Sequence, residues 1–240
     1  MVSVVVSQSM YFPWVGLLEQ VSSADLFVHY DDVQYVRGFC NRVQLKTPGG
    51  QKWMTVPLRG WHRGQRIDEV QVDESADWRS KHIEIMCQAY RKAPYVDDMI
   101  RLAEEVFSKP AANIADISRE TILALVNYFD IGKGVKFTNS SSLDISGRST
   151  QRLHDIVSTL GGDIYITGHG AKNYLDHDIF ERSGIEVRYM QYSLLPYPQL
   201  HGEFTPFVSA LDLVANCGRA GRQYIHSKTV NWKEFVHGSW

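Results

Sequence analysis

The N-terminal part of the chain places apolar runs and amphipathic stretches in the order typical of a parallel sheet. Val2–Val6 is a continuous β-branched run, which is typical of a strand buried on both faces. Residues 15–22 are predicted to form a helix, and Leu26–Tyr30 a second strand. A strand, a helix and a strand in this order make a βαβ unit, which predicts that the two strands pair in parallel.

The period changes between residues 40 and 72, where apolar and polar residues alternate one by one. The stretches 41–46 and 51–58 flank Thr47-Pro48-Gly49-Gly50, a strong turn sequence, and therefore predict a β-hairpin. Residues 67–72 predict one more short strand. A helical section follows at about residues 76–130, with helices expected at 78–90, 96–107 and 114–129.

Strand and helix patterns alternate again after residue 134. Strands are predicted at 135–138, 163–167 and 186–192, and helices at 149–160, 171–175 and 208–218. The whole chain, residues 1–240, is therefore predicted to be a single α/β domain. Its expected fold class is a Rossmann-like, mostly parallel sheet that carries an inserted hairpin (about residues 40–72) and the inserted helical section.

A loop rich in proline and aromatic residues, Pro196–Phe207, precedes the last predicted helix. Three prolines in eleven residues fix φ and remove backbone donors, so the path of the loop is expected to be stiff. The loop presents Tyr197 and His201 either as parts of a surface turn or as the wall of a small-molecule site. Asp212 and Asn216 share one face of the helix that follows and could orient His201.

Composition and charge narrow the classes of partner. The formal net charge is −2 and no block of Lys and Arg occurs, so no nucleic-acid partner is expected. The three cysteines are widely spaced, which indicates a reducing compartment, and the N-terminal apolar run is too short for a signal peptide or a membrane span. We therefore expect a cytoplasmic protein without a membrane partner, and leave a homo-oligomer open. No spacing of metal ligands occurs, and no motif identifies a cofactor.

Polar residues follow each strand of the predicted parallel sheet, at the edge where ligands bind in such folds. Because the carboxyl ends of parallel strands lie at one edge, we expect these loops to converge on one pocket. The residues are Gln8 and Tyr11 after the first strand, Asp31 and Asp32 after the second, Asn139–Ser142 after the third, His169 and Lys172 after the fourth, and Tyr197–His201 after the fifth.

Several of these side chains suit catalysis or binding, although each also has an ordinary structural explanation. Asp31 and Asp32 could ligate Mg²⁺ or hold a general base, or they could form a turn. Only one of them is expected to face the site, because adjacent strand residues point to opposite faces. His169 lies between two glycines and suits proton transfer near neutral pH, or belongs to a turn. Arg42 could bind a carboxylate or phosphate through its planar guanidinium group, or be a surface residue of the hairpin.

Segments along nearly the whole chain resemble the WbqC-like family. They are Ser7–Gly16, Tyr30–Tyr35 with Asn41-Arg42, Trp53–Pro57, Trp78 with Lys81-His82, Ala93-Pro94-Tyr95, Gly168–Leu175 and Pro196–Gly218. The resemblance implies a cytoplasmic enzyme of surface-polysaccharide biosynthesis, such as that of the lipopolysaccharide O-antigen. It also implies a nucleotide-linked sugar as the substrate.

We hypothesise from this resemblance a transferase that adds an acyl or aminoacyl group to the amine of a nucleotide-linked amino sugar. His201 or Asp31 would be the base, and His169 with Lys172 would stabilise developing negative charge or bind phosphate. The residues expected to contact the substrate are Gln8, Tyr11, Trp14, Asp32, Asn41, Arg42, Lys172, Tyr197 and Asn216.

Two alternatives remain open at the level of the sequence. The first is an ATP-dependent ligase or nucleotidyltransferase on a Rossmann-like sheet, which would need ATP and Mg²⁺, although no HxGH phosphate-binding motif occurs. The second is a non-catalytic sugar-binding component of a polysaccharide assembly system. Such a component would bind nucleotide sugar without forming a product.

Overall fold

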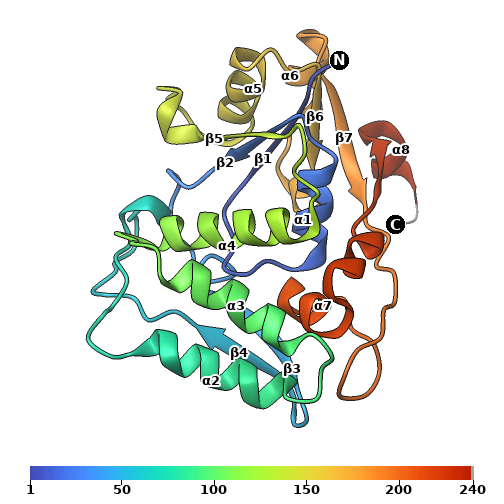
Figure 1. Cartoon of the computed structure of the whole chain (residues 1–240). Helices are drawn as coiled ribbons and strands as arrows, with labels where there is room; N and C mark the ends of the chain where they lie inside the picture. Colours follow the sequence, from blue (N-terminus) through green and yellow to red (C-terminus); the bar gives the residue numbers. More distant parts are fainter. Residues whose placement is uncertain (239–240) are drawn as a thin grey trace.

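A six-stranded sheet forms the centre of the computed structural model, which describes residues 1–238. The strands lie in the order β5-β2-β1-β6-β7-β8, and only β8 runs antiparallel to its neighbour (Figure 1). In this sheet Val5 lies opposite Phe27 on one side and Ile166 on the other. The strand bounds are β1 Ser3–Ser7, β2 Leu26–His29, β5 Lys136–Asn139, β6 Ile164–Thr167, β7 Glu186–Gln191 and β8 Lys228–Asn231.

The order of the strands reverses beside β1. The chain moves outward from β1 to β2 and then to β5, and returns to place β6 on the other side of β1. Loops on the two sides of this reversal leave in opposite directions, which opens a crevice beyond the carboxyl ends of β1 and β6. The fold therefore defines one preferred place for a ligand before any side chain is considered.

Helices cover both faces of the sheet. Because successive residues of a strand point to opposite faces, alternate residues are buried under different helices. Val5 and Phe27 belong to the core shared with α1 and α4, whereas Val4 and Val6 belong to the core shared with α5, α6 and α8. The helix bounds are α1 Val15–Ser22, α2 Trp78–Tyr90, α3 Val96–Phe107, α4 Ile114–Phe129, α5 Ser149–Thr159, α6 His177–Arg182, α7 Ala210–Cys217 and α8 Trp232–His237.

The inserted segment extends the core on one face of the sheet. Its hairpin consists of β3 (Arg42–Thr47) and β4 (Gly50–Thr55) and packs against α2. Figure 1 shows α3, α2 and the hairpin stacked on the side of α4 that faces away from the sheet. Buried residues run without interruption from Val5 through this region, so the insertion is joined to the sheet by apolar packing.

The structure confirms the mixed α/β fold with a mostly parallel sheet and an inserted hairpin, and it corrects two elements. Residues 67–72 do not form a strand: Ile67–Glu69 is a short 3₁₀ turn, and Val72 makes one isolated bridge to Leu58. The apolar residues Ile67, Val70 and Val72 are buried in the core that also includes α4, and their spacing resembles that of a strand. The helix expected at residues 171–175 is instead a 3₁₀ helix over His169–Asn173. The sequence analysis also missed α6, β8 and α8; Val230 is the only apolar residue of β8.

Candidate functional site

A large pocket lies at the reversal of the strand order. Its volume is about 960 Å³, within the upper part of the range of small-molecule sites. Ser7 and Gln8 after β1, Thr167–Ala171 after β6 and Gln191-Tyr192 at the end of β7 all line it. Aromatic side chains complete the wall, namely Trp14, Tyr30, Tyr174 and Phe207. We call it the switch-point pocket.

A second hollow of about 510 Å³ adjoins the first. Both are lined by Gln8, Tyr30, Leu153 and Tyr174, so these residues form the boundary between them. The second hollow is also lined by Asp32 and by the start of α5, with Gly147, Arg148, Ser149 and Arg152. We call it the arginine pocket.

Asp32 and Arg152 form a nearly buried ion pair in the arginine pocket. Arg152 Nη2 donates to Asp32 Oδ2 at 2.5 Å, and both side chains are 8% exposed. Burial alone would raise the pKa of Asp32, but hydrogen bonds from Arg152 and Ser140 outweigh it, so the pKa lies below its usual value. The guanidinium group of Arg152 also lies 5.1 Å from the ring centre of Tyr30. Arg152 is thus neutralised by its partner and helps to hold the pocket wall.

The start of α5 supplies the remaining positive potential in the arginine pocket. The first N–H groups of a helix carry a partial positive charge, and the N-cap residue Arg148 has no side-chain acceptor to pair with them. Arg148 is exposed, and its neighbours Gly147 and Ser149 both have positive φ, 103° and 55°. A left-handed serine is a strained conformation, of the kind found at binding sites. This end of the cleft is therefore suited to an anion.

His169 is the histidine that the structure places in the switch-point pocket. Its Nε2 lies 2.6 Å from the carbonyl oxygen of Met190, which can only accept, so Nε2 carries the hydrogen. Nδ1 is then the acceptor nitrogen of the neutral ring. The ring packs against Tyr192, whose hydroxyl accepts a hydrogen bond from Gln20 at 2.6 Å. The carbonyl group of Met190 and the ring of Tyr192, which Gln20 holds in place, thus fix the position of His169.

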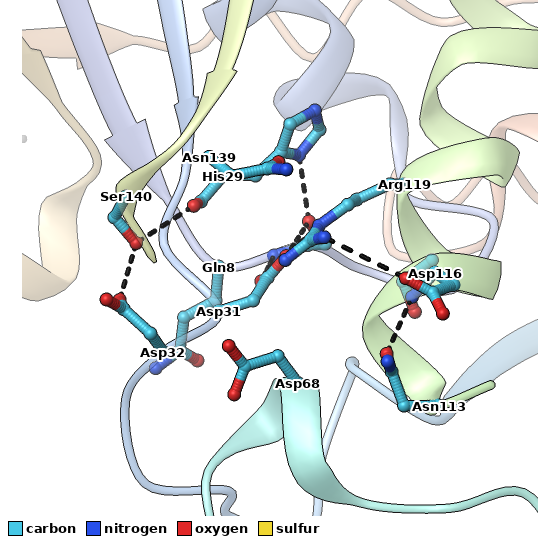
Figure 2. Close-up of polar contacts among 12 residues, drawn as sticks. Gln8, His29, Asp31, Asp32, Asp68, Asn113, Asp116, Arg119, Asn139 and Ser140 are labelled. Atoms are coloured by element: carbon cyan, nitrogen blue, oxygen red, sulfur yellow. Dashed lines mark hydrogen bonds and ion pairs between the residues drawn. The ribbon is translucent and has the colours of Figure 1, made fainter. Parts of the chain in front are cut away.

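Asp31 points away from Asp32, into a buried network (Figure 2). Arg119 Nε of α4 donates to Asp31 Oδ2 at 2.7 Å, and the hydroxyl and N–H of Ser9 each donate to Asp31 at 2.8 Å. Asp31 is fully buried and lines neither pocket. The network fastens the loops that follow β1 and β2 to α4, and so positions the floor of the site.

Ser9, His29 and Asp31 resemble a catalytic triad in composition but not in hydrogen bonding. The ionised Asp31 can only accept, so the Ser9 hydroxyl proton is directed to it. His29 Nδ1, 2.9 Å from Ser9 Oγ, must then donate to the serine instead of accepting its proton. Burial and the nearby charge of Arg119 lower the pKa of His29 to about 4. The arrangement does not activate Ser9 as a nucleophile.

Some of the residues expected at the site do meet there, and others lie in the inserted region. Gln8, Trp14, Asp32 and His169 line the two pockets, while Lys172 is exposed on the same 3₁₀ turn as His169 and lies over the ring of Phe235. Three others have structural contacts elsewhere: Tyr11 donates to His82, Asn41 bonds to Tyr35 and Val56, and Arg42 stacks on Trp53.

The loop at Pro196–Phe207 is held by a separate buried network instead of lining the switch-point pocket along its length. Asp212 accepts hydrogen bonds from the hydroxyls of Tyr90 and Tyr197, each at 2.9 Å, and from Gln199 at 2.7 Å. Lys46 donates to Gln199 Oε1 at 2.7 Å. These bonds tie the loop to α7, α2 and β3, which accounts for its unusual composition.

His201 belongs to the same structural region. Its Nε2 lies 2.7 Å from the carbonyl oxygen of Ala89, in the last turn of α2, where carbonyl groups lack partners within the helix. Asn216 bonds to the backbone of Leu200 and of Asp212 and does not contact His201 through an observed hydrogen bond. The expected convergence of His201 with Gln8 and Asp31 in one pocket is therefore wrong.

The sequence analysis missed several residues of the cleft. Tyr30 and Tyr192 follow the ends of β2 and β7, a position from which a side chain reaches the carboxyl edge of the sheet. Arg148 and Arg152 stand at the start of a predicted helix after a glycine, a recognisable signal for an anion site. Gln20 could not be recognised as a site residue from the sequence, because glutamine is common inside amphipathic helices. Among residues 1–238, no three His, Cys, Asp or Glu side chains lie close enough together to hold a metal ion.

The sheet and its pockets define a Rossmann-like α/β protein with a large pocket at the topological switch point, where such folds bind ligands. The model of the WbqC-like protein family matches residues 8–224, and the chain belongs to this family. It is 31% identical to an uncharacterized protein of Mycobacterium tuberculosis, Rv1507c, over 94% of this chain and 98% of that protein. No solved structure matches the chain. In residues 1–238 every helix is too short or too polar to cross a membrane.

Proposed function

We propose that the chain is a transferase of bacterial surface-polysaccharide biosynthesis, which adds an acyl or aminoacyl group to the amine of a nucleotide-linked amino sugar. The observation that carries the proposal is the pair of adjoining pockets at the switch point. One has aromatic and amide walls, and the other has Arg148 and the start of α5. A nucleotide sugar has matching parts, because its rings suit the first pocket and its diphosphate suits the second.

The chemistry requires a base near the attacking amine. As the amine nitrogen attacks the acyl carbonyl carbon, it must lose a proton, and the acyl carrier leaves with the electrons of the broken bond. His169 presents Nδ1 as an acceptor and lines the pocket, so it is the base in this proposal. Gln8 and Gln191 would orient hydroxyl groups of the sugar.

The direct test is product analysis by mass spectrometry. The protein is incubated with a panel of nucleotide-linked amino sugars and with candidate acyl and aminoacyl donors. An amide product that depends on both substrates supports the proposal. Product formed only with ATP and Mg²⁺ and abolished by EDTA would instead identify a ligase or nucleotidyltransferase, and saturable binding without any product would identify a sugar-binding component.

Replacing Arg148 with alanine is expected to weaken the binding of nucleoside diphosphates about tenfold, because one charge-assisted contact to phosphate is lost. Calorimetric titration with UDP, GDP and dTDP measures the effect. Arg91→Ala, an equivalent change at the exposed end of α2, is the matched control and should leave affinity unchanged. Equal affinities of the wild type and Arg148→Ala for these nucleoside diphosphates would show that the diphosphate does not bind in the arginine pocket.

Replacing His169 with glutamine is expected to lower kcat by about 10²–10⁴-fold and to change KM little. Glutamine can still donate to the Met190 carbonyl, so the pocket keeps its shape while the acceptor nitrogen is lost. Steady-state kinetics of His169→Gln and His201→Gln, measured side by side, separate the two candidate bases. A large loss in His201→Gln with a small one in His169→Gln would return the role to His201.

A further inference from the structure

Glu19 is a buried carboxyl group with one oxygen that lacks a partner. It lies in α1, is 1% exposed, and its Oε2 has no hydrogen-bond partner among the described residues. Ser227 donates a hydrogen bond to the side chain and also accepts one from the N–H of Ser193 at 3.1 Å. A buried carboxylate with an unsatisfied oxygen is costly, and native structures keep such groups rarely. A buried carboxyl group at position 19 therefore indicates a role other than stabilising the fold.

Glu19 lines a small cavity, which we call the Glu19 cavity. Four aromatic residues line it, and Glu19 is the only charged residue among its lining residues. Its free volume is about 10 Å³, the space of about one water-sized group. The aromatic lining consists of Trp14, Tyr197, Phe204 and Tyr224.

The Glu19 cavity shares a wall with the switch-point pocket. Trp14 and Leu194 line both spaces, so these two side chains separate them. Leu194 has a positive φ of 46° and is 39% exposed, an unfavourable combination for a branched apolar residue. Leu194 thus holds a strained conformation in the wall between the two cavities.

The chemistry of the Glu19 cavity selects a cation. A carboxylate attracts positive charge, and the faces of aromatic rings add to that attraction when water is excluded. The space suits the head of a primary ammonium group and is too small for a guanidinium group or a sugar ring. Burial raises the pKa of Glu19 to about 7, against the effect of the Ser227 hydrogen bond, so the carboxylate form is within reach near neutral pH.

We propose that the Glu19 cavity is a subsite for the primary ammonium group of an amine-bearing substrate, with Glu19 as its counter-ion. This ammonium group is one that does not react, because the attacking amine of the proposed function loses its proton to His169 in the switch-point pocket. Its assignment to a substrate of the transferase rests on the proposed function. The subsite would distinguish a substrate that carries this ammonium group from one with a hydroxyl group in its place, because an uncharged hydroxyl does not offset the buried carboxylate.

Methylammonium is the probe, since it carries the ammonium head on a single methyl group. Its nitrogen alone fills the free space of about 10 Å³, so its methyl group must displace part of the cavity wall. In protein labelled with ¹³C at glutamate side chains, methylammonium chloride should shift the Glu19 carboxyl signal saturably, with a Kd on the order of 10 mM. It should also lower the pKa of Glu19 below about 7, because the cation favours the ionised form. Methanol, the uncharged probe of equal size, should produce no saturable shift.

Two variants complete the experiment, with the indole signal of Trp14 as the reporter. Glu19→Gln keeps size and shape but removes the charge, and should weaken methylammonium binding at least tenfold. Glu104→Gln, at an exposed position of α3, is the matched control and should bind as the wild type does. Equal responses to methylammonium and methanol, or unchanged binding in Glu19→Gln, would overturn the proposal and leave the oxygen to an ordinary buried water.

The probe experiment is independent of the transferase assay. Methylammonium binding that requires Glu19 would support the subsite even if no nucleotide-linked amino sugar is turned over. Turnover of an amino sugar by a protein that ignores methylammonium would support the proposed function and reject the subsite.

Discussion

Glu19→Gln is expected to raise the free energy of unfolding by about 3 kcal/mol at pH 8. Burial raises the pKa of Glu19 from 4.5 to about 7, so the folded protein holds this proton more tightly than the unfolded chain does. Ionising the side chain therefore destabilises the folded state. Glutamine keeps the side chain neutral at every pH and removes this cost.

The effect of Glu19 on stability has a defined pH window. Below pH 4.5 the group is protonated in both states and contributes nothing. Between pH 4.5 and about 7 the wild type loses stability relative to Glu19→Gln, and above about 7 the full difference is present. Urea unfolding at pH 5 and pH 8 should give a difference below about 1 kcal/mol at the lower pH. A pH-independent difference, or one shared by Glu104→Gln, would contradict the assignment.

Arg119→Ala is expected to lower the free energy of unfolding by about 3–5 kcal/mol, because it leaves the Asp31 carboxylate buried without its counter-ion. The Arg119 side chain is 17% exposed and that of Asp31 is fully buried, so water cannot replace the lost partner. Chemical unfolding monitored by circular dichroism measures the loss.

The matched control for Arg119→Ala is Arg222→Ala. Arg222 pairs with Asp130 at 2.9 Å, but these side chains are 56% and 68% exposed. Solvent screens such a pair, and its loss should cost less than about 1 kcal/mol. Similar losses in the two variants would mean that Asp31 is not held by a buried ion pair of the kind described.

The long helices were predictable from the sequence because their buried residues recur at helical spacing and their ends are clear. Residues 78–90, 96–107 and 114–129 were expected as helices, and the structure has helices with the same bounds. Asp77 and Asn113 cap two of them through their side chains, and prolines lie between the segments. Local sequence was sufficient to predict these helices, since side-chain spacing, caps and prolines each act within one or two helical turns.

The site was predictable only where it depends on the ends of strands. The expectation that Gln8, Asp32 and His169 lie at the edge of the sheet follows from the βαβ order, and all three line the cleft. The assignment of His201 to the same place failed, because a stiff aromatic loop looks the same whether it binds a ligand or packs against Asp212. Only contacts between distant parts of the chain distinguish the two.

The amino-acid sequence by itself determined the long helices, most strands of the parallel sheet and the family, because period, capping and turn residues act over short distances. The tertiary structure alone decided which neighbour faces the cleft, as with Asp31 and Asp32, and which carboxyl is left without a partner, as with Glu19. Burial and pairing depend on side chains far away in the sequence, such as Arg119 and Ser227, and no local pattern encodes their distance.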